Sequence, residues 1–378
     1  MASKWAAASR RSLQPAMTME KSSLPRVCLD CEPLKDLNSG FSHFVVPLAH
    51  ELLAQNERQP RFRFQCFTPP TAVGALGPGV NYLTQRSFHK YFNPHSYRLR
   101  LWHATQQLSW YVPTSPLTKV VLTVHDLNFL HENPDEHTYS RQLAMVRRNL
   151  NRADYVVTIS DYVRQDILRH AELLGVHGRK PLRYIRRGVE ALAPAADHQP
   201  AYAPSHSFLF GLGTINAKKN WRVLLALLPD TDYELVLAGS FADPAYADAL
   251  LAEARQAGLG GRVHLLTRIS EADKTWYLEH CAAYVHPSLA EGFGLPVVEA
   301  LQLGKPVFLS RLTSLPEVGG DAAYYFDSFE PAAMRQALAA GLARHSPARA
   351  AAARTQAGQF SWAQAATEYL QVYEELVG

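Results

Sequence analysis

Two glutamates that flank a glycine-containing loop are the residues of this chain most suited to chemistry. Glu291 precedes Gly292 and Gly294, and Glu299 follows Glu291 by eight residues. A glycine loop that leads into a helix presents free backbone N–H groups and the positive end of the helix dipole, which together suit a diphosphate. Carboxylates accept hydrogen bonds from hydroxyl groups, so the two glutamates suit a sugar and the diol of a ribose. The competing interpretation is an ordinary turn with both glutamates on the surface.

Basic and polar residues follow three other apolar runs. Lys218 and Lys219 come after FLFGLG (208–213), where their charges could neutralise a pyrophosphate leaving group; alone, they would be interpreted as solvated residues. Ser39 and Gly40, preceded by Asn38, lead from the run at 26–30 into a helical pattern, so their amides could touch phosphate or form a plain turn.

His125 directly follows the apolar run VVLTV (120–124). A histidine at the carboxyl end of a buried strand suits binding of sugar hydroxyls or transfer of protons. A satisfied core histidine is the alternative interpretation, and Asp126 beside it is expected to orient the loop.

Each of these candidate residues follows a short apolar run. Such runs alternate with helical patterns along the chain, which predicts an α/β fold with parallel sheets. The Ala- and Pro-rich segment 191–206 predicts a linker between two Rossmann-like, doubly wound domains that face a central cleft, where ligands bind at the carboxyl ends of strands. The predicted strands are 26–30, 62–67, 120–124, 155–160, 208–213, 233–239, 262–266, 282–287 and 305–310. The predicted organisation is a disordered leader (1–23), a first domain (24–190), the linker (191–206), a second domain (207–360) and a C-terminal helix (361–378).

Composition narrows the class of protein. Hydrophobic residues make up 47% and charged residues 19% of the 378, as in a folded soluble protein. No run approaches the roughly 18 apolar residues of a membrane-spanning helix, and the N-terminal segment lacks the apolar core of a signal peptide. The four cysteines include a Cys28–Cys31 pair without a second such pair, so we interpret them as reduced core thiols of a cytoplasmic protein.

Charge is unevenly distributed along the chain. Residues 1–190 hold 25 Lys and Arg against 15 Asp and Glu, whereas the remainder holds 13 against 19. A basic first half suggests attraction to an anionic partner such as a membrane surface or a lipid phosphate, although a solvated, biased surface explains it equally well. No nucleic-acid-binding motif accompanies this charge, so we expect no nucleic-acid partner.

The stretch 286–307 resembles the E-x7-E signature of family 4 glycosyltransferases, with Glu291 and Glu299 at its two ends. The segments SLPEVGGDAAYYFD (314–327) and SWAQAATEYLQVYEEL (361–376) are also similar to the family's next elements. The resemblance covers the chain from about Leu24 and is densest over 207–327. It implies the GT-B fold, transfer of a hexose with retention of anomeric configuration, and a last helix that crosses back to the first domain.

The resemblance also implies roles for individual residues. The implied catalytic residues are His125, beside the transferred sugar, Glu291 and Lys219. The implied donor-binding residues are Ser39, Gly40, Lys218, Lys219, Arg268, Gly292, Phe293, Gly294, Leu295 and Glu299, with Arg268 at the base. Two departures stand out: Thr214 or Ile215 occupies a position where many members have arginine, and Arg186–Arg187 replaces a common Pro–Asn pair.

The expected mechanism relies on charge stabilisation and positioning. No second carboxylate stands out as a covalent nucleophile, so we expect the leaving diphosphate itself to deprotonate the acceptor hydroxyl. No metal motif is apparent, and we expect no cofactor other than the nucleotide-diphosphate sugar that serves as co-substrate. Two alternatives remain open: a catalytically silent nucleotide-sugar-binding subunit, and an epimerase or phosphorylase of the same fold, against which the glutamate pair argues.

Substrates are indicated only by further resemblance. The segment GTINAKKN (213–220) is similar to members that use GDP-mannose, which makes mannose the expected sugar. Aromatic and basic residues between Tyr82 and Tyr111, among them Lys90, Trp102 and Trp110, would suit a lipid-linked glycan acceptor at an anionic membrane, or would simply pack and be solvated. The sequence thus predicts polysaccharide or lipopolysaccharide assembly in the cytoplasm, with peripheral contact at the inner face of the membrane.

Overall fold

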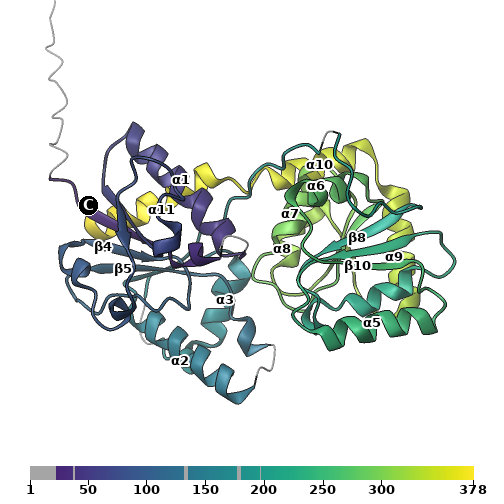
Figure 1. Cartoon of the computed structure of the whole chain (residues 1–378), viewed down its shortest axis with the longest axis horizontal. Helices are drawn as coiled ribbons and strands as arrows, with labels where there is room; N and C mark the ends of the chain where they lie inside the picture. Colours follow the sequence, from purple (N-terminus) through teal and green to yellow (C-terminus); the bar gives the residue numbers. More distant parts are fainter. Residues whose placement is uncertain (1–22, 37–38, 132–134, 177–179, 196) are drawn as a thin grey trace, which may run out of the picture.

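The chain forms two α/β lobes that lie side by side (Figure 1). The computed structural model describes residues 23–36, 39–131, 135–176, 180–195 and 197–378. All but the last residue of the expected leader, and also Asn38, lie outside these described ranges. Each lobe contains one parallel sheet with helices on both faces, which confirms the predicted α/β class with two doubly wound sheets.

The sheet of the first lobe has seven strands in the order β3-β2-β1-β4-β5-β6-β7, all paired in parallel. Its central strands are short apolar runs because helices cover both faces and leave little backbone exposed to water. The strands are β1 (Arg26–Asp30), β2 (Arg63–Thr68), β3 (Tyr82–Thr84), β4 (Leu101–Ala104), β5 (Lys119–Val124), β6 (Tyr155–Thr158) and β7 (Leu182–Tyr184).

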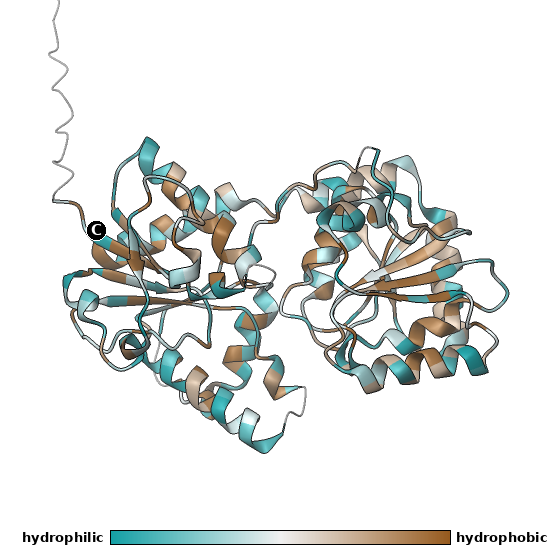
Figure 2. Cartoon of the chain, in the orientation of Figure 1, coloured by the Kyte–Doolittle hydropathy of each residue, from teal (hydrophilic) through white to brown (hydrophobic). Residues whose placement is uncertain are grey.

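The sheet of the second lobe has six parallel strands in the order β10-β9-β8-β11-β12-β13. The strands are β8 (Phe208–Leu212), β9 (Glu234–Ala238), β10 (Val263–Leu266), β11 (Ala283–His286), β12 (Val307–Ser310) and β13 (Tyr324–Phe326). Figure 2 colours each residue by hydropathy. Hydrophobic residues (brown) are frequent in the strands, and hydrophilic residues (teal) are frequent on the surrounding helices, as expected for sheets buried on both faces. The segment 185–207 between the two sheets contains no helix or strand among its described residues.

Helices cover both sheets. In the first lobe they are α1 (Ser42–Arg58), α2 (Glu136–Arg152), α3 (Asp161–Arg169) and α4 (Ala171–Leu174). In the second lobe they are α5 (Pro244–Gln256), α6 (Glu271–His280), α7 (Leu295–Gln302), α8 (Leu315–Gly319), α9 (Pro331–Arg344) and α10 (Pro347–Ala357). None of the helices in the described part of the chain is long and apolar enough to cross a membrane.

The last helix, α11 (Trp362–Val377), belongs spatially to the first lobe, where its yellow ribbon runs beside α1 (Figure 1). The Tyr369 hydroxyl lies 2.8 Å from Oγ1 of Thr123 on β5. The Tyr373 hydroxyl lies 2.7 Å from Nδ1 of His103 on β4. All four side chains are buried. The closing helix therefore completes one face of the first sheet.

Three strands of the first lobe, β3, β4 and β7, were not predicted. The most consequential is β4, because it lies at the centre of the sheet between β1 and β5. Its Trp102 is fully buried against Phe67, at a centroid distance of 5.1 Å, so of the two interpretations left open for Trp102 the lipid-facing one is wrong and the packed one is confirmed. The strand is only four residues long and follows exposed arginines, so it lacks a recognisable apolar run.

The four cysteines, Cys28, Cys31, Cys66 and Cys281, are all buried and form no disulfide. This confirms their interpretation as core thiols. Burial raises the pKa of the Cys28 thiol well above its usual value, which keeps it protonated and unreactive.

Candidate active site

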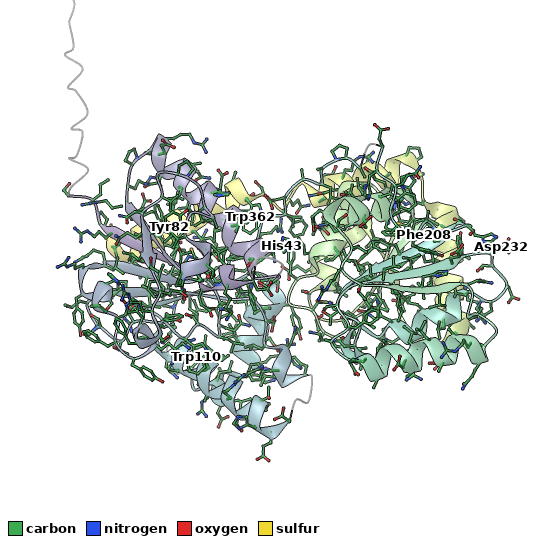
Figure 3. The ribbon with its side chains drawn as sticks, in the orientation of Figure 1. His43, Tyr82, Trp110, Phe208, Asp232 and Trp362 are labelled. Carbon is green, nitrogen blue, oxygen red and sulfur yellow. The ribbon has the colours of Figure 1, made fainter. Side chains whose placement is uncertain are left out.

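Two adjoining cavities open between the lobes, at the carboxyl ends of both sheets. The larger, of about 710 Å³, is bounded by loops that follow strands of the second lobe. The smaller, of about 380 Å³, extends along the backbone of 189–194. The side chains common to both cavities are His43, Glu271, Lys274, Leu295 and Glu299. Figure 3 shows His43 at the junction of the lobes, so residues from both sides bound this space.

The glycine loop leads into a helix as the sequence predicts. Gly294 precedes α7 with φ of 96°, a conformation that favours glycine, and no side chain caps the helix. Pro296 occupies the first turn, where its missing N–H costs nothing. Leu295 and Pro296 line the larger cavity, so the uncapped N-terminus of α7 faces the space where an anion would bind.

Glu291 and Lys219, both predicted as catalytic, form a direct ion pair. The same carboxylate oxygen of Glu291 lies 2.8 Å from Nε2 of His286, at the end of β11. Burial disfavours charge on Glu291, but Lys219 and His286 outweigh that cost and hold the pKa of the carboxyl well below its usual value. Glu291 is therefore a fixed anion that orients Lys219, rather than a proton donor.

Glu299 lies on α7 and is paired with a lysine from another element. Its Oε1 lies 2.7 Å from Nζ of Lys274 on α6, and Glu271 contacts the same ammonium at 2.6 Å. Burial works against the charge of Lys274, but Glu299 and Glu271 outweigh it and raise the pKa of the lysine. The cavity wall thus carries two carboxylates that share one cation, an arrangement that suits recognition of neighbouring hydroxyls.

His125 does not line either cavity. Its side chain is buried against the edges of Phe41 and Phe44, with ring centroids 4.9 and 4.6 Å away. Nε2 donates to the carbonyl of Thr105 at 2.8 Å. Burial lowers the pKa of His125 to about 3, and nearby Arg187 adds to the effect. The imidazole is therefore neutral at physiological pH and carries its proton on Nε2.

The other predicted donor residues occupy different positions around the cavities. Arg268 lines the larger cavity, in a left-handed conformation with φ of 52°. The backbone carbonyl of Lys218 accepts from the amide of Leu289 at 2.9 Å and so ties the lysine loop to the glycine loop. Ser39 and Gly40 precede α1 but do not line the cavities; His43, one turn later, does.

Arg187 is a buried cation that the sequence singled out without a role. Its guanidinium lies 5.0 Å from the ring centroid of Phe293 in the glycine loop and 5.7 Å from those of Phe44 and Trp362. Pro47, inside α1, has no N–H to donate to the carbonyl of His43, and that carbonyl accepts from Nη2 of Arg187 at 3.1 Å. Burial lowers the pKa of Arg187 to about 10. The guanidinium therefore remains charged, and it contacts the first lobe through Phe44, the second lobe through Phe293 and α11 through Trp362.

The lobes also touch directly. Oγ of Ser160, the N-cap of α3, donates to the carbonyl of Gly292 at 2.9 Å. An added Cβ on Gly292 would lie 2.2 Å from the carbonyl oxygen of His125, so only glycine fits this close approach. On the other side, the carboxylate of Glu317 accepts from the amides of Asp161 and Tyr162 at 2.9 and 3.1 Å. The glycine loop is therefore positioned by the first lobe as well as by its own.

Comparison with known proteins identifies the family. The family model for "Glycosyl transferases group 1" matches residues 199–356. O-antigen chain mannosyltransferase B of Escherichia coli is 30% identical over 286 residues, which are 71% of this chain and 73% of that protein. The chain belongs to the group 1 glycosyltransferases.

Other similar proteins agree with this assignment. The serotype-specific mannosyltransferase WbdA of Escherichia coli is 25% identical over 315 residues, which are 78% of this glycosyltransferase but only 36% of WbdA. Sucrose-phosphate synthase from Thermosynechococcus elongatus superposes with a TM-score of 0.71 at 20% identity, covering 93% of this chain and 99% of that one. Alr3699/HepE of Anabaena in complex with UDP gives 0.70 at 18% identity, covering 93% and 100%. The fold is thus GT-B, as the resemblance implied.

Several residues of the site were missed by sequence reasoning. His43, Lys274 and His286 come from α1, α6 and β11, and only tertiary packing brings them to the site; Arg187 was noted in the sequence, but its place beside the glycine loop was not predicted. One signal was available for His43, since a proline inside a helical pattern leaves the carbonyl four residues earlier without its usual partner.

Proposed function

We propose that this glycosyltransferase moves mannose from GDP-mannose to a glycan acceptor during assembly of a cell-surface polysaccharide or lipopolysaccharide. The observation that carries the proposal is the shared activity in the names of its relatives. O-antigen chain mannosyltransferase B and WbdA are mannosyltransferases, and a 27% identical relative from Komagataeibacter xylinus is a GDP-mannose:cellobiosyl-diphosphopolyprenol alpha-mannosyltransferase. The last match covers 41% of this chain.

The geometry supports a donor diphosphate bound at the N-terminus of α7. The uncapped amides of that helix supply hydrogen-bond donors, and Lys219 supplies a positive charge held in place by Glu291. Arg268 also lines the larger cavity, and we assign it a contact with the nucleotide base. Glu299 would accept hydrogen bonds from a diol while Lys274 holds its orientation. In this proposal the chain's own cations balance the diphosphate, without a metal or other cofactor.

We propose further that the reaction retains the anomeric configuration. The leaving diphosphate accepts the proton of the attacking hydroxyl, since Glu291 is already committed to Lys219 and His286. His125 is neutral and packs behind the cavities against Phe41 and Phe44, so in this proposal it supports the loop structure and does not donate a proton. Closure of the lobes over the donor would exclude water and limit hydrolysis. We also propose a cytoplasmic location for the enzyme. Its four cysteines are buried and form no disulfide, which is typical of proteins in a reducing compartment.

Thermal-shift binding of GDP-, UDP- and ADP-linked sugars tests the donor. GDP-mannose should raise the melting temperature of wild type and not that of Glu299→Gln, which removes the charge paired with Lys274. Glu253→Gln is the matched control, because Glu253 pairs with Arg222 at the exposed surface of the same lobe. Stabilisation by UDP- or ADP-sugars alone would overturn GDP-mannose as donor. NMR of the product gives the anomeric configuration of the transferred sugar. A configuration opposite to that of the donor would overturn the proposed retaining route.

A further inference from the structure

The first lobe carries a cluster of exposed aromatic side chains on the sheet face opposite α1 and α11. They project from the short helices η3 (Ser87–Lys90) and η4 (Pro94–Arg98), from the turn between these helices and from the loop after β4. Their exposed fractions are 49% for Phe88, 89% for Tyr91, 56% for Phe92, 59% for Tyr97 and 41% for Trp110. Large apolar side chains gathered in this way on a surface usually mark a binding face.

Positive charge surrounds this cluster. No Asp or Glu occurs from residue 58 to residue 125, a run of 68 residues that contains eight Lys and Arg. The ammonium of Lys90 lies 5.5 Å from the ring centroid of Trp110, and the guanidinium of Arg148 lies 6.0 Å from it. The exposed cations around the rings are Arg86, Lys90, Arg98, Arg100 and Arg148. We call these five cations and the five aromatic residues the aromatic–basic face.

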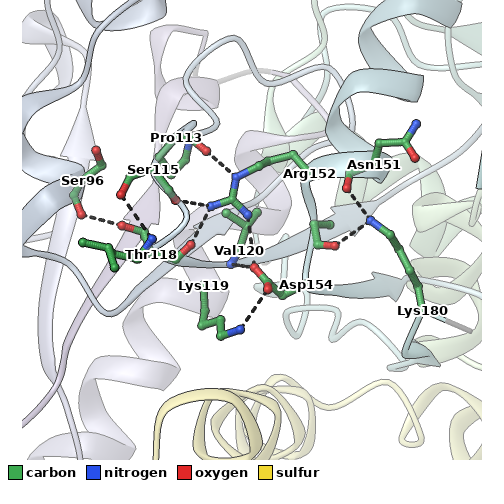
Figure 4. A network of polar contacts seen from close by, with 12 residues as sticks. Ser96, Pro113, Ser115, Thr118, Lys119, Val120, Asn151, Arg152, Asp154 and Lys180 are labelled. Atoms are coloured by element: carbon green, nitrogen blue, oxygen red, sulfur yellow. Dashed lines mark hydrogen bonds and ion pairs between the residues drawn. The ribbon is translucent and has the colours of Figure 1, made fainter. Parts of the chain in front are cut away.

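The backbone beneath the aromatic–basic face is fixed by a polar network (Figure 4). The guanidinium of Arg152 donates to the carbonyls of Pro113, Ser115 and Thr118 at 2.7, 2.7 and 2.6 Å. The Thr118 hydroxyl in turn donates to the carbonyl of Ser96 within η4. The helix η4 is therefore held, through Ser96, to α2 and the start of β5, so this part of the face does not need to order on binding.

We propose that the aromatic–basic face docks onto the surface of an anionic lipid bilayer. Aromatic side chains favour the interface between headgroups and acyl chains, and clustered Lys and Arg are attracted to anionic headgroups. A neutral glycan would gain nothing from five surrounding cations. The rings of Phe88 and Phe92, moreover, have no polar atom with which to orient a sugar. The proposal does not rest on the donor or acceptor proposed above.

The placement of the face suits such docking. Figure 3 shows Trp110 on the first lobe away from His43, which lies at the junction between the lobes. Contact through Trp110 and its neighbours therefore leaves the cavities between the lobes open to a sugar nucleotide from solution.

Co-sedimentation of the full chain with vesicles tests the proposal. Wild type should bind vesicles of phosphatidylcholine with about one third phosphatidylglycerol, and should not bind pure phosphatidylcholine vesicles. Each charge near the surface contributes about fivefold in affinity. Neutralising Lys90, Arg98 and Arg100 to Gln should therefore weaken binding roughly 100-fold, and added salt should do the same. Phe88→Ser with Phe92→Ser should weaken binding to anionic vesicles without changing its salt dependence.

Controls separate docking from folding and from bulk charge. The matched charge control replaces Arg255, Arg344 and Arg354, three exposed arginines of the second lobe, by Gln. This variant should bind vesicles within threefold of wild type, and all variants should keep the wild-type melting temperature. Equal losses in both triple variants would overturn the face as the docking surface. Wild-type binding to neutral vesicles, no vesicle binding at all, or face-dependent binding to a soluble mannan instead would each overturn the lipid bilayer as the partner.

Discussion

Replacing Gly292 by alanine tests whether the contact between the lobes matters for catalysis. The added Cβ would lie 2.2 Å from the carbonyl oxygen of His125 and 2.8 Å from Cβ of Asp126. Since such contacts are not tolerated below about 3 Å, the glycine loop and the first lobe must separate by roughly 1 Å. A misplacement of about 1 Å can cost on the order of 100-fold in rate, or about 2.7 kcal/mol of transition-state stabilisation. We therefore expect kcat/KM to fall by about two orders of magnitude.

The assay is initial-rate transfer from the sugar nucleotide, combined with thermal unfolding and small-angle scattering. Overpacking should lower stability by about 1–3 kcal/mol, so the variant should remain folded while its radius of gyration rises. Gly261→Ala is the matched control, because an added Cβ there would meet nothing within 4 Å. Activity of Gly292→Ala within threefold of wild type would show that the observed approach of the lobes is not the reacting geometry.

Three further predictions concern buried polar groups. Arg187→Gln should weaken binding of a nucleoside diphosphate more than binding of the nucleoside, measured by calorimetry, because Arg187 is a charge beside the glycine loop; equal weakening would indicate a purely structural role. Tyr373→Phe should lower the free energy of unfolding by about 1–3 kcal/mol in urea, since it removes the hydroxyl from His103. Burial lowers the pKa values of His103 and His125 to about 3, so the unfolded state binds more protons below pH 6.5. Stability should then fall by about 1.2 kcal/mol for each histidine between pH 6 and pH 5, and His125→Gln should reduce that slope. A slope unchanged by the substitution would contradict a neutral, buried His125.

The parts predicted best from sequence are those whose chemistry is local. The loop from Glu291 to Gly294 and the start of α7 follow from glycine, proline and helix-end rules that operate within a few residues. Glu291 and Lys219 were both expected near the site because their loops follow apolar runs that form the neighbouring strands β11 and β8, but the ion pair between them was not predicted.

What could not be predicted depends on packing between distant elements. Lys274 has the sequence context of an ordinary helical lysine, and only the approach of α6 to α7 makes it the partner of Glu299. His125 follows a strand as expected, but Phe41 and Phe44 on the α1 side bury it and remove it from the cavities. The sequence left Trp102 open between a lipid-facing surface and the core because β4 is too short to show a period, whereas pairing with β1 and β5 places the strand at the centre of the sheet.

The position of α11 has a consequence for the order in which the protein is made. Because Tyr369 and Tyr373 fill the core of the first lobe, that lobe cannot finish folding when residues 24–190 leave the ribosome. The face of its sheet that α11 covers stays open until the entire second lobe has been synthesised, since α11 follows it in the chain. The nascent first lobe therefore carries an exposed apolar groove for the time needed to translate nearly two hundred residues, and it should bind chaperones during that interval.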